Sequence, residues 1–188
     1  MTSPKKVPEI KVRKLSLDEF ELASGFYKSI GYIQGIQSQN KFFAAFHDNT
    51  MVGLVRLAFE NEHWVLRGMQ IKPSYQFFGI GSKLVQLLEK DVGSEQCFCL
   101  PHGWLDKFYS QIGFQKVESL EEVPQFLVDR FFENKKKYPQ LILMKRLPYT
   151  YYSIKKLDFS SSKIFFTRNW NTACSVCSRK FENGSKCI

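Results

Sequence analysis

The chain has 188 residues, of which 44% are hydrophobic and 24% are charged, a balance typical of one globular domain with a full-sized core. It contains no apolar run near the roughly 18 residues that cross a membrane. Residues 1–14 are basic and lack the apolar centre of a secretory signal. We therefore expect a cytoplasmic protein with no membrane partner.

The formal net charge of +9 is unevenly distributed along the chain. Residues 148–188 hold seven Lys and Arg against two Asp and Glu, so they carry +5 and leave 9 − 5 = +4 for the body. A mildly basic body suits a polyanionic small molecule. Because the excess lies in the tail, the charge argues against a nucleic-acid binder, although a tail-driven one stays an alternative.

The five cysteines divide into two groups. Cys97 and Cys99 stand in an apolar run and are predicted to be buried thiols, which indicates a reducing compartment. The other three lie in the tail without a histidine, whereas structural zinc usually takes four ligands, so we expect no metal. The composition thus predicts a domain over residues 1–147 and a basic, weakly ordered extension over residues 148–188.

The first elements show clear start and stop signals. Alternating side chains predict a strand over residues 9–15, and Ser16 with Glu19 forms a capping-box pattern before a helix. We expect Gly31 to end that helix and a loop with a short helix to follow over residues 31–40.

The middle of the chain predicts an antiparallel meander, because three strand patterns are separated by short polar turns. A helix and several short elements follow. The predicted strands are 42–46, 52–59, 63–71, 97–100, 114–117 and 141–147, and the predicted helices are 80–91, 105–112 and 123–134. This order indicates a mixed α+β fold.

The start of the 80–91 helix carries a candidate phosphate site. Gly79 and Gly81 let the backbone approach a ligand closely, and the helix N-terminus offers unpaired N–H groups. Ser82 and Lys83 stand in the first turn, where each can contact a phosphate. The same pattern also fits a plain strand-to-helix connection. A dinucleotide site is disfavoured, because a third glycine and a parallel βαβ context are missing.

Two segments closely resemble signatures of the Gcn5-related N-acetyltransferase (GNAT) superfamily, and the order of elements agrees over residues 9–147. The phosphate-binding pattern Gln/Arg-x-x-Gly-x-Gly/Ala is matched by Gln76, Gly79 and Gly81, preceded by Ile71 and Pro73. The later aromatic-Tyr-x-x-x-Gly-Phe pattern is matched by Phe108, Tyr109, Gly113 and Phe114. Phe77 and Phe78 depart from the phosphate-binding pattern, since the family more often has Gly and a basic residue at these two positions.

The resemblance implies an acetyl-CoA-dependent N-acetyltransferase without a metal. Its fold would be a twisted, mostly antiparallel sheet with flanking helices and a splayed parallel strand pair that holds acetyl-CoA. The implied cofactor-binding residues are Met69, Gln70, Ile71, Gln76, Phe77, Phe78, Gly79, Ile80, Gly81, Ser82, Lys83 and Phe108. A backbone N–H near Met69 or Gln70 would stabilise the oxyanion.

The resemblance also implies catalytic roles. Tyr109 would protonate the leaving sulfur, although it also fits a purely packing role. The position of the glutamate base of several family members is Val65, on a strand whose odd-numbered residues 63–71 we expect on one face. His63 and His102 are the alternative bases.

The acceptor stays open, with a small-molecule amine favoured over a histone because the body is basic. A non-catalytic acyl-CoA-binding module of the same fold is the alternative function, and a homodimer is left open.

Overall fold

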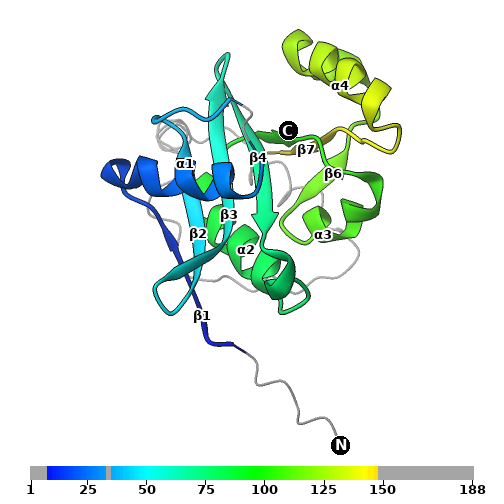
Figure 1. Ribbon diagram of the computed structural model, residues 1–188. Helices are drawn as coiled ribbons and strands as arrows, with labels where there is room; N and C mark the ends of the chain where they lie inside the picture. The colour runs from blue at the N-terminus through cyan, green and yellow to red at the C-terminus, as the bar shows by residue number, and fades with distance from the viewer. Residues whose placement is uncertain (1–7, 33–34, 148–188) are drawn as a thin grey trace, which may run out of the picture. The chain divides into compact units, whose positions relative to one another are not determined.

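The computed structural model describes residues 8–32 and 35–147 (Figure 1). The predicted extension over residues 148–188, with its three cysteines, lies outside the described residues. No helix in the described ranges is long and apolar enough to cross a membrane.

Seven strands form one sheet in the order β1-β2-β3-β4-β5-β7-β6. Each neighbouring pair is antiparallel except β4 and β5, which run parallel. The predicted α+β class and the mostly antiparallel sheet are therefore confirmed. The strands are β1 (Ile10–Lys14), β2 (Lys41–His47), β3 (Thr50–Glu60), β4 (His63–Ile71), β5 (Cys97–Cys99), β6 (Phe114–Lys116) and β7 (Met144–Arg146).

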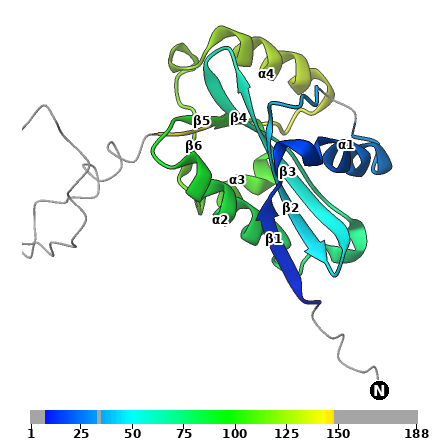
Figure 2. The same cartoon turned by 90° about the vertical axis from the view of Figure 1, so that its left-hand side faces the viewer.

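Helices cover both faces of this sheet (Figure 2). The α-helices are α1 (Phe20–Ser29), α2 (Ile80–Val92), α3 (Asp106–Ser110) and α4 (Gln125–Lys137), and the 3-10 helices are η1 (Leu17–Glu19), η2 (Pro73–Tyr75), η3 (Gly103–Leu105) and η4 (Leu120–Glu122). Leu66 of β4 shares a core with α2 and α3, whereas its neighbour Val65 packs with α4. Since successive strand residues point to opposite faces, α4 lies on the other side of the sheet from α2.

The helical segment that leads through η1 into α1 begins as its sequence predicts. Ser16 and Glu19 form a capping box, in which the backbone N–H of Ser16 donates to Glu19 Oε2 at 3.0 Å. Arg13 binds the same carboxylate at 2.6 Å, and together these contacts lower the pKa of Glu19 to about 2. The expected short helix between residues 31 and 40 is absent from the described part of that segment.

Strand β4 contains a bulge that the sequence pattern does not show. Leu54 pairs with Gln70 and Arg56 pairs with Arg67, so Val55 faces two residues, Gly68 and Met69. Gly68 has a φ of 62°, in the left-handed region that glycine adopts without steric cost. Such an extra residue bends the strand and reverses the side-chain alternation beyond it.

The expectation that odd-numbered residues from 63 to 71 share one face is therefore wrong. Val65 packs on the α4 side of the sheet. Beyond the bulge, Met69 and Ile71 pack on the opposite side, against the core that contains α2. The bulge thus turns Met69 away from the face that Val65 occupies.

The parallel pair separates soon after it forms. Only Trp64, Val65 and Leu66 of β4 pair with β5, although β4 continues to Ile71. Leu100 and Pro101 follow β5, and a proline has no backbone N–H with which to continue a ladder. The predicted splay of the parallel strands is confirmed, with a proline after one strand and a bulge in the other.

Candidate active site

A cavity of about 490 Å³ opens where β4 and β5 separate. Its lining combines residues from both strands with residues from α3, α4 and the segment after α1. These residues are Gly31, Tyr32, Val65, Leu66, Arg67, Gly68, Met69, Gln70, Cys99, Leu100, Pro101, His102, Leu105, Tyr109, Arg130, Asn134, Lys137, Tyr138 and Leu141.

The cavity is lined by residues from both faces of the sheet. Leu66 and Tyr109 in its lining belong to the core on the α2 side. Val65 and Leu141 in the same lining belong to the core on the α4 side. The cavity is therefore bordered by both faces of the sheet at the point where the two strands separate.

Tyr109 lies at this cavity on the α2 side. Its side chain is buried and meets the rings of Phe108 and Phe114 edge to face, with centroids 4.9 and 6.0 Å away. Burial, followed by the nearby Cys99 thiol, raises the pKa of the Tyr109 phenol above its ordinary value. The phenol therefore stays protonated at neutral pH and retains a proton that it can donate.

His102 lies at the same cavity, on the loop after β5. Its ring stacks on Trp104, with centroids 4.3 Å apart and planes at 5°, and the ring of Tyr138 meets it edge-on. An isolated bridge to Leu141 fixes its backbone. Its Nδ1 atom is buried and has no hydrogen-bond partner among the described residues. Because the residue lines the cavity, its imidazole is a candidate base.

His63, the other predicted base, is not brought to the cavity. It stands at the first residue of β4, paired with Glu60 across the turn. Its ring meets Phe98 edge-on and stacks with Phe126 of α4, with centroids 5.8 and 6.3 Å away. The geometry thus assembles Tyr109 and His102 and leaves His63 in an aromatic cluster outside the lining.

The predicted phosphate site occupies the N-terminus of α2. Gly79 is the N-cap residue with a φ of 72°, and its carbonyl accepts the first intrahelical hydrogen bond, from Lys83 N–H at 3.1 Å. The N–H groups of Ile80, Gly81 and Ser82 precede that bond, so the helix itself supplies no acceptor for them. Together they form the donor set that an anion at a helix N-terminus uses.

Two contacts hold this loop in place. Gln76 Nε2 donates to the carbonyl of Ile71 at 3.2 Å, which ties the loop to the end of β4. A Cβ atom on Gly81 would lie 3.2 Å from the ring of Phe108, so that ring packs directly on the glycine backbone. Met69 and Gln70 line the cavity, and Ile71 joins them to the loop. The strand therefore connects the cavity with the helix N-terminus.

Three residues of this loop that were predicted to bind the cofactor differ in how exposed their side chains are. Ile80 is 1% exposed and packs in the core, so only its backbone is available to a ligand. Phe78 is half-buried against the same core. Phe77 is fully exposed, so its ring lies in solvent, and its φ of 68° is in the left-handed region.

Sequence reasoning missed the polar lining on the α4 side. Arg67 of β4 and Arg130 of α4 both bind Glu60, through Nη1 atoms 2.8 and 2.6 Å from its carboxylate oxygens. Arg130, Asn134 and Lys137 line the cavity from positions four and three residues apart, which lie on one face of a helix. This spacing in the sequence could have predicted that the three polar side chains share one face of a helix.

The chain is also similar to known proteins. A family model described as Acetyltransferase (GNAT) domain matches residues 38–116, the region from before β2 to the end of β6. Residues 38–116 therefore match a GNAT acetyltransferase domain. Among curated proteins, no sequence matches the chain.

The fold is similar to several solved structures. Escherichia coli ElaA superposes with a TM-score of 0.51 at 14% identity, over 73% of this chain and 99% of that one. Rv2747 from Mycobacterium tuberculosis, in complex with CoA and NLQ, has a TM-score of 0.50 at 17% identity, over 73% and 98%. N-acetylglutamate synthase from Neisseria gonorrhoeae, with coenzyme A and L-arginine, has a TM-score of 0.50 at 16% identity, over 77% and 34%.

Proposed function

We propose that this protein transfers an acetyl group from acetyl-CoA to the nitrogen of a primary amine. The observation that carries the proposal is the separation of β4 from β5 after three paired residues, which opens a cavity lined by Tyr109 and the Gly68 bulge. Backbone groups exposed on a separated strand can pair with an extended ligand as another strand would. The pantetheine arm of acetyl-CoA is such a ligand.

The two ends of acetyl-CoA fit two parts of the structure. Its pyrophosphate suits the N–H groups of Ile80, Gly81 and Ser82 at the start of α2, with Lys83 as a nearby cation. Its pantetheine arm would then follow β4 from Ile71 toward Met69 and reach the cavity. Two structures of similar fold, Rv2747 and N-acetylglutamate synthase, were solved with coenzyme A bound, which supports this assignment.

The proposed reaction is a direct transfer. The amine nitrogen attacks the thioester carbonyl carbon, a C–N bond forms, and the C–S bond breaks. A backbone N–H of Met69 or Gln70 stabilises the negative charge that develops on the carbonyl oxygen. Tyr109 gives its phenolic proton to the departing sulfur, and His102 takes a proton from the amine, directly or through water.

Product analysis tests the transfer. Purified protein is incubated with acetyl-CoA and a panel of amines, and both free CoA and the acetylated amine are quantified by mass spectrometry. The proposal predicts equal amounts of the two products with at least one amine. Acetyl-CoA that binds but is never consumed would instead identify a non-catalytic acyl-CoA-binding module.

A further inference from the structure

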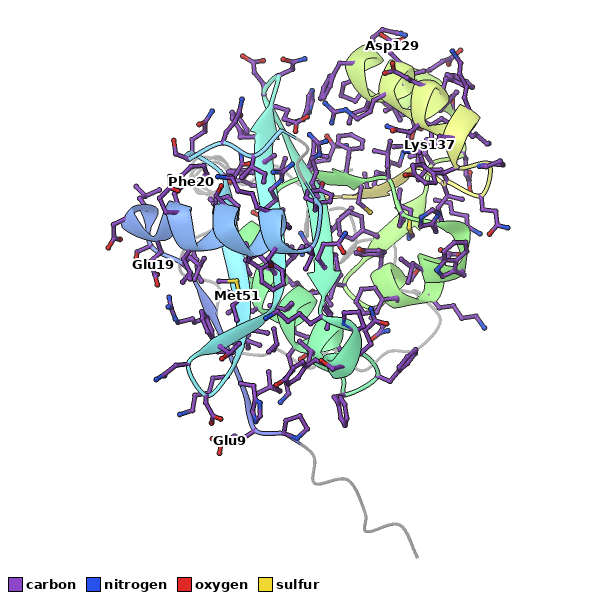
Figure 3. The ribbon with its side chains drawn as sticks, in the orientation of Figure 1. Glu9, Glu19, Phe20, Met51, Asp129 and Lys137 are labelled. Carbon is purple, nitrogen blue, oxygen red and sulfur yellow. The ribbon has the colours of Figure 1, made fainter. Side chains whose placement is uncertain are left out.

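The charged side chains of the cavity all have one sign. Arg67, Arg130 and Lys137 line it, and no aspartate or glutamate is present among the described residues of that lining. Lys137 lies in the last turn of α4 (Figure 3). We call Arg67, Arg130 and Lys137 the cationic wall. An amine is itself a cation when protonated, so the cationic wall would repel a simple amine.

These cations lie on the wrong side of the sheet to serve the pyrophosphate of CoA. The N-terminus of α2 belongs to the face on which Leu66 packs. Helix α4, which supplies Arg130 and Lys137, covers the opposite face with Val65. The cationic wall therefore borders the side of the cavity from which the acceptor would enter.

Glu60 orients the two arginines without cancelling their charge. Burial alone would raise the pKa of Glu60, but hydrogen bonds and charges from Arg67 and Arg130 outweigh it and lower the pKa below its ordinary value. The carboxylate therefore stays ionised. Glu60, Arg67 and Arg130, the Glu60 triad, together carry a net charge of +1. A guanidinium has about five N–H donors, so one contact with Glu60 leaves each arginine further donors.

Resting on the function proposed above, we propose that the acceptor is a small amine that also carries a carboxylate, such as a free amino acid. Fixed guanidinium forks match the planar carboxylate and bind it through paired hydrogen bonds. The carboxylate would contact Arg130 and Lys137 and offset the positive charge of the wall. The amine would then extend from this anchor toward the thioester beside Met69.

The test compares pairs of acceptors that differ only in whether they carry the carboxylate. The twenty standard L-amino acids are offered alongside their carboxamides, and CoA release gives kcat/KM for each. We expect at least one amino acid to exceed its carboxamide by tenfold or more. In Arg130→Gln and Lys137→Gln variants that ratio should fall about tenfold.

A matched control removes the same charge from the same helix. Lys135 lies over the ring of Phe131, 4.9 Å from its centroid, and is outside the cavity lining. Lys135→Gln should keep the wild-type preference. Equal rates with the two members of every pair, a preference for the carboxamide, or turnover only with amines that lack a carboxylate would overturn the inference.

Binding of acetyl-CoA separates this inference from the proposed function. Thermal stabilisation by acetyl-CoA, measured on the same samples, reports the cofactor site alone. Protein that binds acetyl-CoA and acetylates carboxylate-free amines keeps the proposed function and overturns only the acceptor class. Protein that binds acetyl-CoA but acetylates no amino acid also overturns the acceptor class. Protein that does not bind acetyl-CoA overturns both.

Discussion

The hydroxyl of Tyr27 in α1 donates a hydrogen bond of 2.8 Å to the carbonyl oxygen of Gly68, the residue at the bulge of β4. Tyr27 is fully buried, and burial raises the pKa of its phenol above the ordinary value, so the proton stays in place. The contact ties the helix to the point where β4 reverses its side-chain alternation. It thereby fixes the position of Met69, which follows the bulge and lines the cavity.

Substitution at Gly68 should be costly for two reasons. Its φ is 62°, and a Cβ atom there would lie only 2.7 Å from the hydroxyl oxygen of Tyr27. We expect Gly68→Ala to lower the free energy of unfolding by about 2 kcal/mol or more. Tyr27→Phe alone should cost about 1 kcal/mol for the lost hydrogen bond. Urea unfolding measures both.

The double variant separates the clash from the backbone strain. Tyr27→Phe removes the nearest atom that the new methyl group would strike, although ring atoms of residues 27 and 32 stay 3.1 Å away, so the two losses should not fully add. We expect the double variant to be more stable than the sum of the single losses predicts. Full additivity would contradict a direct contact between position 68 and the Tyr27 hydroxyl.

Tyr109→Phe tests proton donation to the leaving sulfur. The variant keeps the buried ring between Phe108 and Phe114 and removes only the hydroxyl. General acids contribute factors of 10² to 10⁴, so we expect kcat to fall about 10²-fold while acetyl-CoA still stabilises the protein. Tyr75→Phe is the control, because that hydroxyl contacts His47 at 2.8 Å and is outside the cavity lining. An unchanged kcat would assign Tyr109 a packing role only.

The two histidines that the sequence offers as alternative bases can be distinguished by one matched pair of variants. His102→Gln removes the imidazole that lines the cavity and should lower kcat/KM by about tenfold or more, within the range expected of a general base. His63→Gln changes a ring that packs on Phe98 and Phe126, and it should leave kcat/KM nearly unchanged. The opposite ranking would place the base at His63.

The Glu60 triad predicts a pH-dependent contribution to stability. The pKa of Glu60 lies below its ordinary value of 4.5, so the stabilisation is complete above that value and is lost as pH falls through the folded-state pKa. Glu60→Gln should therefore cost about 1 kcal/mol at pH 7 and less at pH 3. Urea unfolding of both proteins at the two pH values measures the difference. A cost that is independent of pH would show that the charge of Glu60 is not involved.

Much of the fold was predictable because its signals are local. The capping box of Ser16 and Glu19 depends on near neighbours in sequence, and the structure has the predicted helix after it. The match at Gln76, Gly79 and Gly81 likewise led to the helix that begins at Ile80.

The remainder depends on contacts between distant segments. The bulge at Gly68 could not be read from alternating polarity, because it appears only when β4 pairs with β3. That single residue reversed the predicted face of Met69 and Ile71. Glu60, Arg67 and Arg130 gave no signal as a group, since their contacts join the turn end of β3, the middle of β4 and α4.

The most direct test of the account is heat unfolding with and without acetyl-CoA in the wild type, Gly79→Asp and Gly79→Asn. Both residues tolerate the positive φ of Gly79 better than most, and they differ only in charge at the proposed phosphate site. We predict a clear rise in Tm with acetyl-CoA for the wild type and for Gly79→Asn, and little or none for Gly79→Asp. Equal rises in all three proteins would contradict a pyrophosphate site at the start of α2, and no rise in the wild type at millimolar acetyl-CoA would contradict the acetyltransferase function itself.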